Sequence, residues 1–356
     1  MGFLDIFRNQ ASKKTWVRIA DDHVSGSSSG ASINPDDAYF VVRMNEMYLQ
    51  RTRKLWQKYY PLLHGFTKYQ GEETHSLAGP GQLREISDSN LDRIAGFNYR
   101  LAGPTPYQGE EVEVIVGLYS VPGGDAAKAL VDTLATLAAI PALGLGGVDE
   151  IVGAVKTGVE KVLGLTETRL ELGVRDSFYS GNPLKAGFHV GIDAAPTEID
   201  LSRLWFNRGR LVTGDRPESA IPYTDHDYMV IELERRETRN DWRGFPEFAP
   251  FEQKVASIFA DHELSQDQKK ERLNRIWVDF RQAINDSRKL ISRDREQVAA
   301  SVAKKIKDGF AVPDLLESVA AAPSGFDFVD VPDALDHRDK DALREARELL
   351  KDRKPF

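Results

Sequence analysis

The stretch that decides the fold is NYRLAGPTPYQGEEVEVIVGLYSVPGG, residues 98–124. Valines stand at every second position from Val112 to Val116, which is the period-two pattern of a β-strand with one buried face. The Pro-Gly-Gly at 122–124 ends this run, and the Gly-Pro-Thr-Pro at 103–106 predicts a turn before it. A strand this clear near the middle of the chain predicts that the surrounding body is built on a sheet.

Further strands are predicted on both sides of this stretch. Aromatic and β-branched residues crowd several segments that are separated by turn signals. This spacing favours an α+β protein with a mostly antiparallel, sandwich-like sheet body. The polar, glycine-containing stretch 65–94 is expected to be a long excursion. The two segments 38–50 and 53–63 fit either two strands or a strand and a short helix. The predicted strands lie within 38–50, 53–63, 168–178, 184–195, 199–206 and 228–235.

Two regions predict helices. Residues 125–165 are rich in alanine and leucine at helical spacing and are interrupted by Pro141 and several glycines, which predicts an apolar helical hairpin inserted in the sheet body. Nearer the C-terminus, Ser265 and Gln268 form a capping-box pattern at the start of a long helix. Its apolar stripe comprises Leu273, Ile276, Trp277, Phe280, Ile284 and Ile291, and a second helix carries Val298, Val302 and Ile306.

These patterns divide the chain into four parts. Residues 1–36 are an N-terminal segment with a Ser/Gly-rich hinge, and 37–245 are the β-rich body with its hairpin. Residues 246–310 form a helical region, and 311–356 form a polar tail with a terminal helix. With 356 residues and 41% apolar content, the chain is long enough for two or three packed domains.

Composition excludes several kinds of chemistry. The formal net charge of −8 disfavours binding to nucleic acid or anionic membranes at long range. The chain has no cysteine, which excludes disulfides, thiol nucleophiles and cysteine-ligated metals. The glycines at 144–153 lie between helical segments and lack a Gly-Lys-Ser/Thr triplet, so no cofactor is expected and no small-molecule substrate is identified. The first residues lack the apolar run of a secretory signal, so a cytoplasmic location is expected.

The sequence GSSSG at 26–30 fits the pattern of a hydrolase nucleophile elbow, with Ser28 as the nucleophile. An elbow connects a buried strand to a helix, whereas a strand-like run follows here after Pro35. His23 and Asp21 also stand too close in the chain to act as the distant partners of a catalytic triad. We therefore interpret this stretch as a flexible joint.

The densest titratable group lies in TDHDY, residues 224–228. Asp225, His226 and Asp227 offer imidazole nitrogen and carboxylate oxygen, the ligands of a divalent metal. One hypothesis is therefore a metal-dependent hydrolase centred on His226 and Asp227, with His189 as the most suitable distant ligand. The alternative is a strand end with a hydrogen-bonded structural histidine.

Basic and aromatic residues cluster in three segments, 51–60, 203–210 and 235–243. Arginine and tryptophan dominate the binding energy of protein interfaces. Since no catalytic pattern fits its structural context, our leading hypothesis is a non-enzymatic protein-binding or scaffold protein, whose partner is another protein or a second copy. A nucleic-acid groove and plain solvated strand faces are the alternatives. The candidate interface residues are Trp56, Arg203, Trp205, Arg208, Arg239 and Trp242.

A membrane-acting protein is the third hypothesis. Residues 133–148 carry no charge, so the hairpin at 125–165 is a candidate for membrane insertion, although this uncharged run is too short to span a bilayer. An amphipathic turn at the N-terminus would add peripheral membrane contact or dock into a partner. Its apolar residues are Phe3, Leu4, Ile6 and Phe7.

Overall fold

The computed structural model describes residues 14–25, 29–50, 53–54, 57–78, 93–122, 169–178, 184–239 and 241–311. The chain divides into two compact units. The first contains residues up to Pro35 and Phe40–Arg235, and the second contains Asp36–Tyr39 and the chain from Arg236 onward. Each unit has its own core, and the two are described separately.

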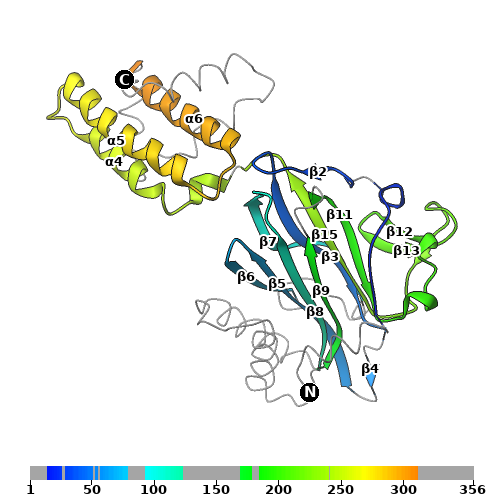
Figure 1. Cartoon of the computed structure of the whole chain (residues 1–356). Coiled ribbons are helices and arrows are strands. Elements are labelled where there is room, and N and C mark those ends of the chain that lie inside the picture. The colour runs from blue at the N-terminus through cyan, green and yellow to red at the C-terminus, as the bar shows by residue number, and fades with distance from the viewer. Residues whose placement is uncertain are drawn as a thin grey trace. The chain divides into compact units, whose positions relative to one another are not determined.

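The first unit is built on antiparallel sheets, which confirms the α+β class with mostly antiparallel strands (Figure 1). One five-stranded sheet has the order β1-β11-β15-β3-β7. Its strands are β1 (Thr15–Arg18), β3 (Tyr39–Tyr48), β7 (Arg93–Pro106), β11 (Gly187–Ile192) and β15 (Tyr228–Arg236). The long run β3 is almost wholly buried, as expected of a strand covered on both faces.

A second five-stranded sheet contains β8, which carries the alternating valines of 112–116. The order is β4-β5-β8-β9, with β6 also paired to β5. Its strands are β4 (Arg53–Lys54), β5 (Gln57–Tyr69), β6 (Glu72–Ala78), β8 (Val112–Pro122) and β9 (Arg169–Phe178). The alternating valines lie in β8 as predicted. Most of 38–50 and the described residues within 53–63 lie in strands, which is the first of the two alternatives for these segments.

Two sequence expectations for the large sheets were wrong. Residues 65–78 are not part of an excursion, because β5 and β6 pair through a tight turn at Gln70 and Gly71, both at positive φ (52° and 78°). The Gly-Pro-Thr-Pro at 103–106 is not a turn but the end of β7. Strand β7 lies at the edge of its sheet, where a proline without an N–H group removes no necessary ladder hydrogen bond.

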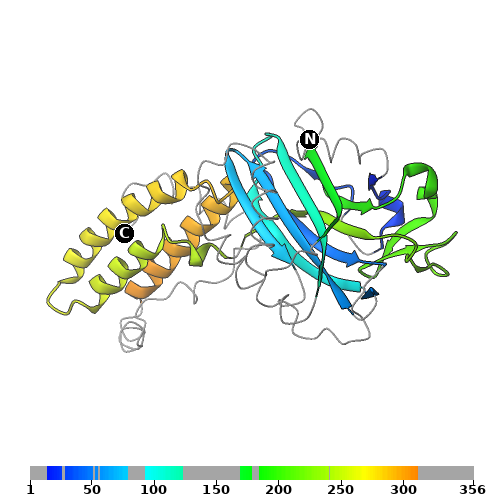
Figure 2. The same ribbon diagram turned by 90° about the horizontal axis from the view of Figure 1, so that it is seen from below.

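Two short sheets complete the first unit: β2 (Ser32–Ile33) pairs with β10 (Leu184–Lys185), and β12 (Leu204–Asn207), β13 (Arg210–Thr213) and β14 (Ile221–Pro222) form a three-stranded sheet. Short 3-10 helices flank them: η1 (Asp21–His23), η4 (Pro196–Glu198) and η5 (Leu201–Arg203). Figure 2 views the same strands from below. The predicted hairpin at 125–165 lies outside the described residues.

The second unit is helical in its described part. A 3-10 helix, η6 (Asp241–Gly244), precedes α4 (Ala249–Ala260), α5 (Gln266–Asp286) and α6 (Ser292–Ala311). Their apolar faces share one core, in which Leu273, Trp277, Phe280 and Ile284 of α5 are buried as predicted. The stripe does not continue along one helix to Ile291, because α5 ends at Asp286 and α6 starts at Ser292. The tail after 311 lies outside the described residues.

The predicted capping box at the start of α5 is confirmed. The Gln268 backbone N–H donates to Ser265 Oγ (3.2 Å), and the Ser265 N–H donates to Gln268 Oε1 (2.9 Å). We expect Ser265→Ala to lower the free energy of unfolding of the helical unit by about 1 kcal/mol, because a first-turn N–H loses its acceptor. Urea denaturation would measure this change. Ser257→Ala, at an exposed position inside α4, should have a smaller effect.

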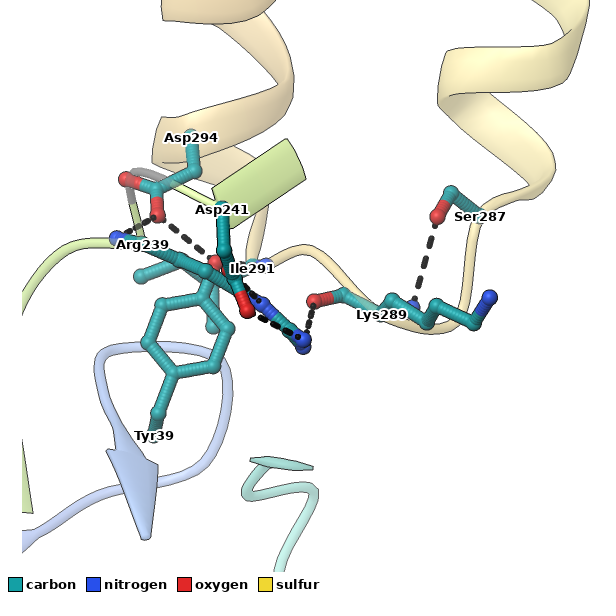
Figure 3. Close-up of polar contacts among 7 residues, drawn as sticks. All are labelled: Tyr39, Arg239, Asp241, Ser287, Lys289, Ile291 and Asp294. Atoms are coloured by element: carbon teal, nitrogen blue, oxygen red, sulfur yellow. Dashed lines mark hydrogen bonds and ion pairs between the residues drawn. The ribbon is translucent and has the colours of Figure 1, made fainter. Parts of the chain in front are cut away.

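Two chain segments are fixed to the first turn of α6 inside this unit (Figure 3). The buried Tyr39 hydroxyl donates to Asp294 Oδ2 (2.7 Å) and accepts from the Ile291 N–H (3.1 Å). The Arg239 N–H also donates to Asp294 Oδ2 (3.0 Å). Asp36 accepts from the Ser292 N–H (3.0 Å), which caps α6 from a distant part of the sequence.

Candidate functional site

The small sheet β12–β14 packs on the first large sheet within the first unit (Figure 1). Phe206 of β12 stacks on Phe188 of β11, with ring centroids 4.3 Å apart. Leu204 and Leu211 are buried in the same cluster. One face of the small sheet is therefore held by apolar packing, and its hairpin turn and edge are left at the surface.

A two-residue turn joins β12 to β13. Asn207 pairs with Arg210, and the turn residues Arg208 and Gly209 both have positive φ (51° and 76°), as a type I′ turn requires. Asparagine or glycine normally occupies the first turn position. An arginine there costs on the order of 1 kcal/mol, because its Cβ crowds the backbone in the left-handed region. The turn thus holds a guanidinium at a position that is not optimal for stability.

The hairpin and the loop after it are basic. The segment from Arg203 to Arg216 contains four arginines and one acidic residue, Asp215. Asp215 pairs with Arg203 at 3.1 Å. Arg208 and Arg210 are exposed, and within the described residues neither guanidinium has a hydrogen-bond or ion-pair partner. Two arginines are therefore available to an acidic ligand.

Exposed apolar side chains lie on the same small sheet and its flanking helix. Ile221 of β14 is 65% exposed and Leu201 of η5 is 37% exposed. Among the described residues, the only other large hydrophobic side chain exposed to this degree is Val278, in the helical unit. The small sheet thus carries exposed arginines at its turn and exposed aliphatic side chains toward its other end, residue types that are both found in protein interfaces.

Part of the Trp205 side chain already contacts other residues of the protein. Its ring stacks on that of His23, with centroids 3.8 Å apart and planes 11° apart, and its Nε1–H donates to the Gly214 carbonyl (2.8 Å). His23 is fixed in turn, because its Nδ1 lies 2.8 Å from the Leu204 carbonyl oxygen. Trp205 therefore supports this surface and has one ring face covered by His23.

A pocket of about 380 Å³ lies between β1, η1 and η5. Its rim opens to solvent through the exposed residues Ala20, Asp22 and Ser202. Arg18 and His23 also line it. The apolar walls are Val17, Ile19, Val190, Leu201 and Leu204. This pocket adjoins the hairpin, since Leu204 begins β12 and Leu201 lies in η5 just before it.

The remaining Arg/Trp residues do not join this surface in the structure. Arg239 belongs to the helical unit, where it donates two hydrogen bonds to Asp241 (2.5 and 3.1 Å) and lies over the Phe245 ring at 4.5 Å. Trp242 is 6% exposed and packs in the helical core, so the expectation that it lies on a surface was wrong. Trp56 lies outside the described residues. The three segments are thus spread over both units.

His226 lies in a hydrogen-bonded strand end. Tyr223 Oη and His226 Nδ1 are 2.7 Å apart, and Asp227 accepts from the Gln50 N–H (2.5 Å). Burial, helped by the charge of Asp225, raises the pKa of Tyr223 to about 12. Within the described residues, no group of three or more His, Asp or Glu side chains is arranged to hold a metal ion. Nothing here supports the metal-dependent hydrolase.

His189 lies far along the sheet from His226. It is in the middle of β11, opposite Ile231 of β15, whereas His226 precedes that strand. His189 stacks on Trp16 at 5.5 Å and meets the edge of Phe178 at 5.2 Å. It is therefore a buried, aromatic-enclosed residue and not a partner of His226.

Both flanks of the GSSSG stretch are attached to the first unit. Before it, β1 pairs with β11, and Ser25 Oγ donates to Asn207 (2.8 Å). At its C-terminal end, Ser29 Oγ donates to Asp21 (2.5 Å), and the Gly30 N–H donates to the Ala186 carbonyl (2.9 Å). Ser28 itself lies outside the described residues. The N-terminal segment from Thr15 to Arg18 is thus a strand of the sheet.

The membrane hypothesis depends on residues that the structure does not describe. The hairpin at 125–165 and the turn with Phe3, Leu4, Ile6 and Phe7 both lie outside the described residues. Within the part that is described, no helix has the length and apolar character needed to cross a membrane.

No protein family, curated protein or solved structure matches this chain. The site must therefore be interpreted from its own chemistry. Sequence reasoning found Arg203, Trp205 and Arg208 but missed Arg210, Ile221 and the pocket. The Arg-Gly pair at 208–209 between two apolar dipeptides is a hairpin signal that could have placed both arginines at one turn.

Proposed function

We propose that this protein is a non-enzymatic binding protein that recognises an acidic protein partner through the surface formed by η5 and β12–β14, here called the hairpin surface. The observation that carries the proposal is a pair of exposed arginines, Arg208 and Arg210, for which the described residues provide no side-chain partner, at the turn end of a small sheet. The exposed side chains of Leu201 and Ile221 lie toward the other end of the same sheet. Charge complementarity would attract and orient the partner, and the apolar side chains would supply buried area.

The proposal narrows the hypothesis drawn from the sequence. It retains the segment 203–210 as the interface and leaves out Arg239 and Trp242, whose side chains are used inside the helical unit. It also takes the two large sheets as a sandwich-like body that holds the hairpin surface. In support, Trp16 Nε1–H of β1 donates to Asp176 of β9 (2.8 Å), so the two sheets contact through side chains. The cytoplasm is where we expect the partner to be met.

A comparative capture experiment tests this function. Tagged wild-type protein, Arg208→Glu/Arg210→Glu and a control, Arg275→Glu/Arg288→Glu, would each be incubated with native extract and the bound proteins quantified. The control makes the same charge change on exposed residues of the helical unit. We expect to recover a protein that binds to the wild type and to the control and is released by salt. The amount bound should fall at least tenfold with Arg208→Glu/Arg210→Glu. Equal binding to both variants, or no specific binding, would contradict the proposal.

A further inference from the structure

The pocket and the turn arginines lie along one strand. Leu204 lines the pocket at the start of β12, and Arg208 follows the end of that strand. At about 3.3 Å per residue, the four steps between them span roughly 13 Å. The connection is continuous, because Val24 pairs with Phe206 and the Arg208 N–H donates to Ser25 Oγ (3.2 Å).

The pocket has the size and lining to hold one bulky apolar side chain. Its volume of about 380 Å³ is near the lower end of the range of about 300–1,000 Å³ for ligand pockets. Five of its lining residues are aliphatic wall residues, two polar ones, Asp22 and Ser202, are exposed at the rim, and Arg18 and His23 are half-buried. An apolar side chain buried in such a pocket is the usual energetic centre of a protein interface.

Arg208 indicates the second chemical group that a ligand of this surface would carry. Its positive φ is a conformation that asparagine or glycine would adopt with less strain, so the arginine is not explained by the turn itself. Together with Arg210 it places two positive charges at the end of the strand that starts in the pocket. Guanidinium groups bind carboxylate and phosphate, and carboxylate is the one that an unmodified peptide carries.

We propose that the hairpin surface binds an extended peptide segment whose bulky apolar side chain enters the pocket and whose acidic side chain, about four residues away, pairs with Arg208 and Arg210. This inference rests on the proposed function and specifies the partner's recognition motif. A peptide is favoured over a nucleic acid because His23 already covers one face of the Trp205 ring, which limits stacking of a base.

Peptide display on the full-length protein tests the motif. A random dodecapeptide library would be selected on wild-type protein, and enriched sequences would be synthesised with a fluorescent label for polarisation measurements. We expect enriched peptides to combine a bulky apolar residue with Asp or Glu at a spacing of about four. Replacing that acid by its amide, or moving it by two positions, should weaken binding at least tenfold.

Three variants connect the motif to the structure. Leu201→Asp should weaken binding of the selected peptide at least tenfold, because it places a carboxylate in the pocket wall. Arg208→Asn should weaken peptide binding by a similar factor. It should also raise the Tm by about 2 °C, because asparagine adopts the positive φ of this turn position with less strain. A loss of binding in a more stable protein cannot come from misfolding. The control Arg275→Asn, on the exposed face of α5, should leave binding unchanged.

Specific outcomes would overturn the inference. They are no enriched peptide, enriched peptides without an acidic residue, or an enriched peptide whose binding is insensitive to both Leu201→Asp and Arg208→Asn. A single-stranded thymidine oligonucleotide that binds as tightly as the peptide, and loses that binding with Arg208→Asn, would also overturn it. If a native partner still depends on Arg208 and Arg210 in the capture experiment, the inferred motif fails but the proposed function stands.

Discussion

Replacing Asp294 with alanine should lower the free energy of opening of α6 by about 3–5 kcal/mol, the largest single-residue effect we expect in the helical unit. The carboxylate is 3% exposed and accepts from both the Tyr39 hydroxyl and the Arg239 N–H. Without it, two buried donors lose their acceptor, and each hydrogen bond to a charged group is worth about 1.5–3 kcal/mol. Asp294 also lies in the first turn of α6, where negative charge is favourable.

The electrostatics of Tyr39 agree with this interpretation. Burial, followed by the nearby charge of Asp294, raises the pKa of the Tyr39 hydroxyl well above its usual range. The hydroxyl therefore stays protonated at neutral and mildly alkaline pH, where it donates to the Asp294 carboxylate. Tyr39→Phe removes one of the two donors, so it should cost about half as much as Asp294→Ala.

Hydrogen exchange measured by mass spectrometry checks the Asp294 prediction within one unit. Amides of α6 should exchange about 150-fold to 5,000-fold faster in Asp294→Ala than in wild type, the factor that corresponds to about 3–5 kcal/mol. Asp286→Ala is the matched control, because Asp286 is an exposed residue at the end of α5 that accepts only a side-chain bond from Gln282 among the hydrogen bonds described. A double-mutant cycle of Tyr39→Phe and Asp294→Asn should show coupling above 0.5 kcal/mol. Unchanged exchange in α6, or additive effects, would contradict the prediction.

Local sequence pattern was sufficient to predict those elements whose residues interact with near neighbours in the chain. The valines of β8 and the capping box of α5 were both found in this way, because each depends on residues a few positions apart. The pattern failed at 65–78, where polar residues pair in the hairpin β5–β6. Their strand character comes from partners in the sheet and not from apolar periodicity.

Other features depend on distant partners and leave little local signal. The break between α5 and α6 at 287–291 is one example, because α6 is capped by Asp36, which lies 256 residues earlier in the chain. Trp242 is another, since its sequence neighbours are charged but its side chain enters the helical core. The pocket joins β1 to η5, which are nearly 190 residues apart, so no window of sequence shows it.

For the same reason, the residue types of the hairpin surface could be predicted from the sequence, but their availability to a partner could not. The arginines and the tryptophan stand together in RLWFNRGR, but their availability depends on three-dimensional partners. Arg203 is neutralised by Asp215, Trp205 is covered on one side by His23, and Arg208 and Arg210 remain exposed at the turn. The residue types alone indicated an interface, and the contacts decide which of them are available to a partner.

His189 should make the first unit less stable as the pH falls from about 6.5 to about 4. Burial lowers the pKa of His189 to about 4; the charge of Asp176 on β9 opposes this shift, and that of Arg18 on β1 adds to it. In the unfolded chain the same group titrates near 6.5. Between these two values the unfolded state binds a proton that the folded state does not, so stability increases with pH in this window. The full difference of about 2.5 pH units corresponds to about 3 kcal/mol.

The geometry explains why the imidazole stays neutral. His189 is 6% exposed between the rings of Trp16 and Phe178, and the carboxylate of Asp176 is already bound by the Trp16 indole N–H (2.8 Å) and the Ser177 N–H (2.8 Å). A proton on His189 would add a charge in an apolar enclosure whose nearest carboxylate is already hydrogen-bonded. Below pH 4 both states are protonated and His189 contributes no further change.

NMR titration of the histidine ring protons should give a pKa near 4 for His189, and urea unfolding at pH 7.5, 6.5, 5.5 and 4.5 should show the accompanying loss of stability. His189→Phe keeps an aromatic ring of similar size between Trp16 and Phe178, so it should remove about 2.5 kcal/mol of the difference between pH 7.5 and pH 4.5. His226→Gln is the control, and it should retain the wild-type dependence because His226 is at a strand end. If His189→Gln and His189→Phe both keep the wild-type pH profile, protonation of His189 is not what destabilises the first unit in acid, and the carboxylates must carry that dependence instead.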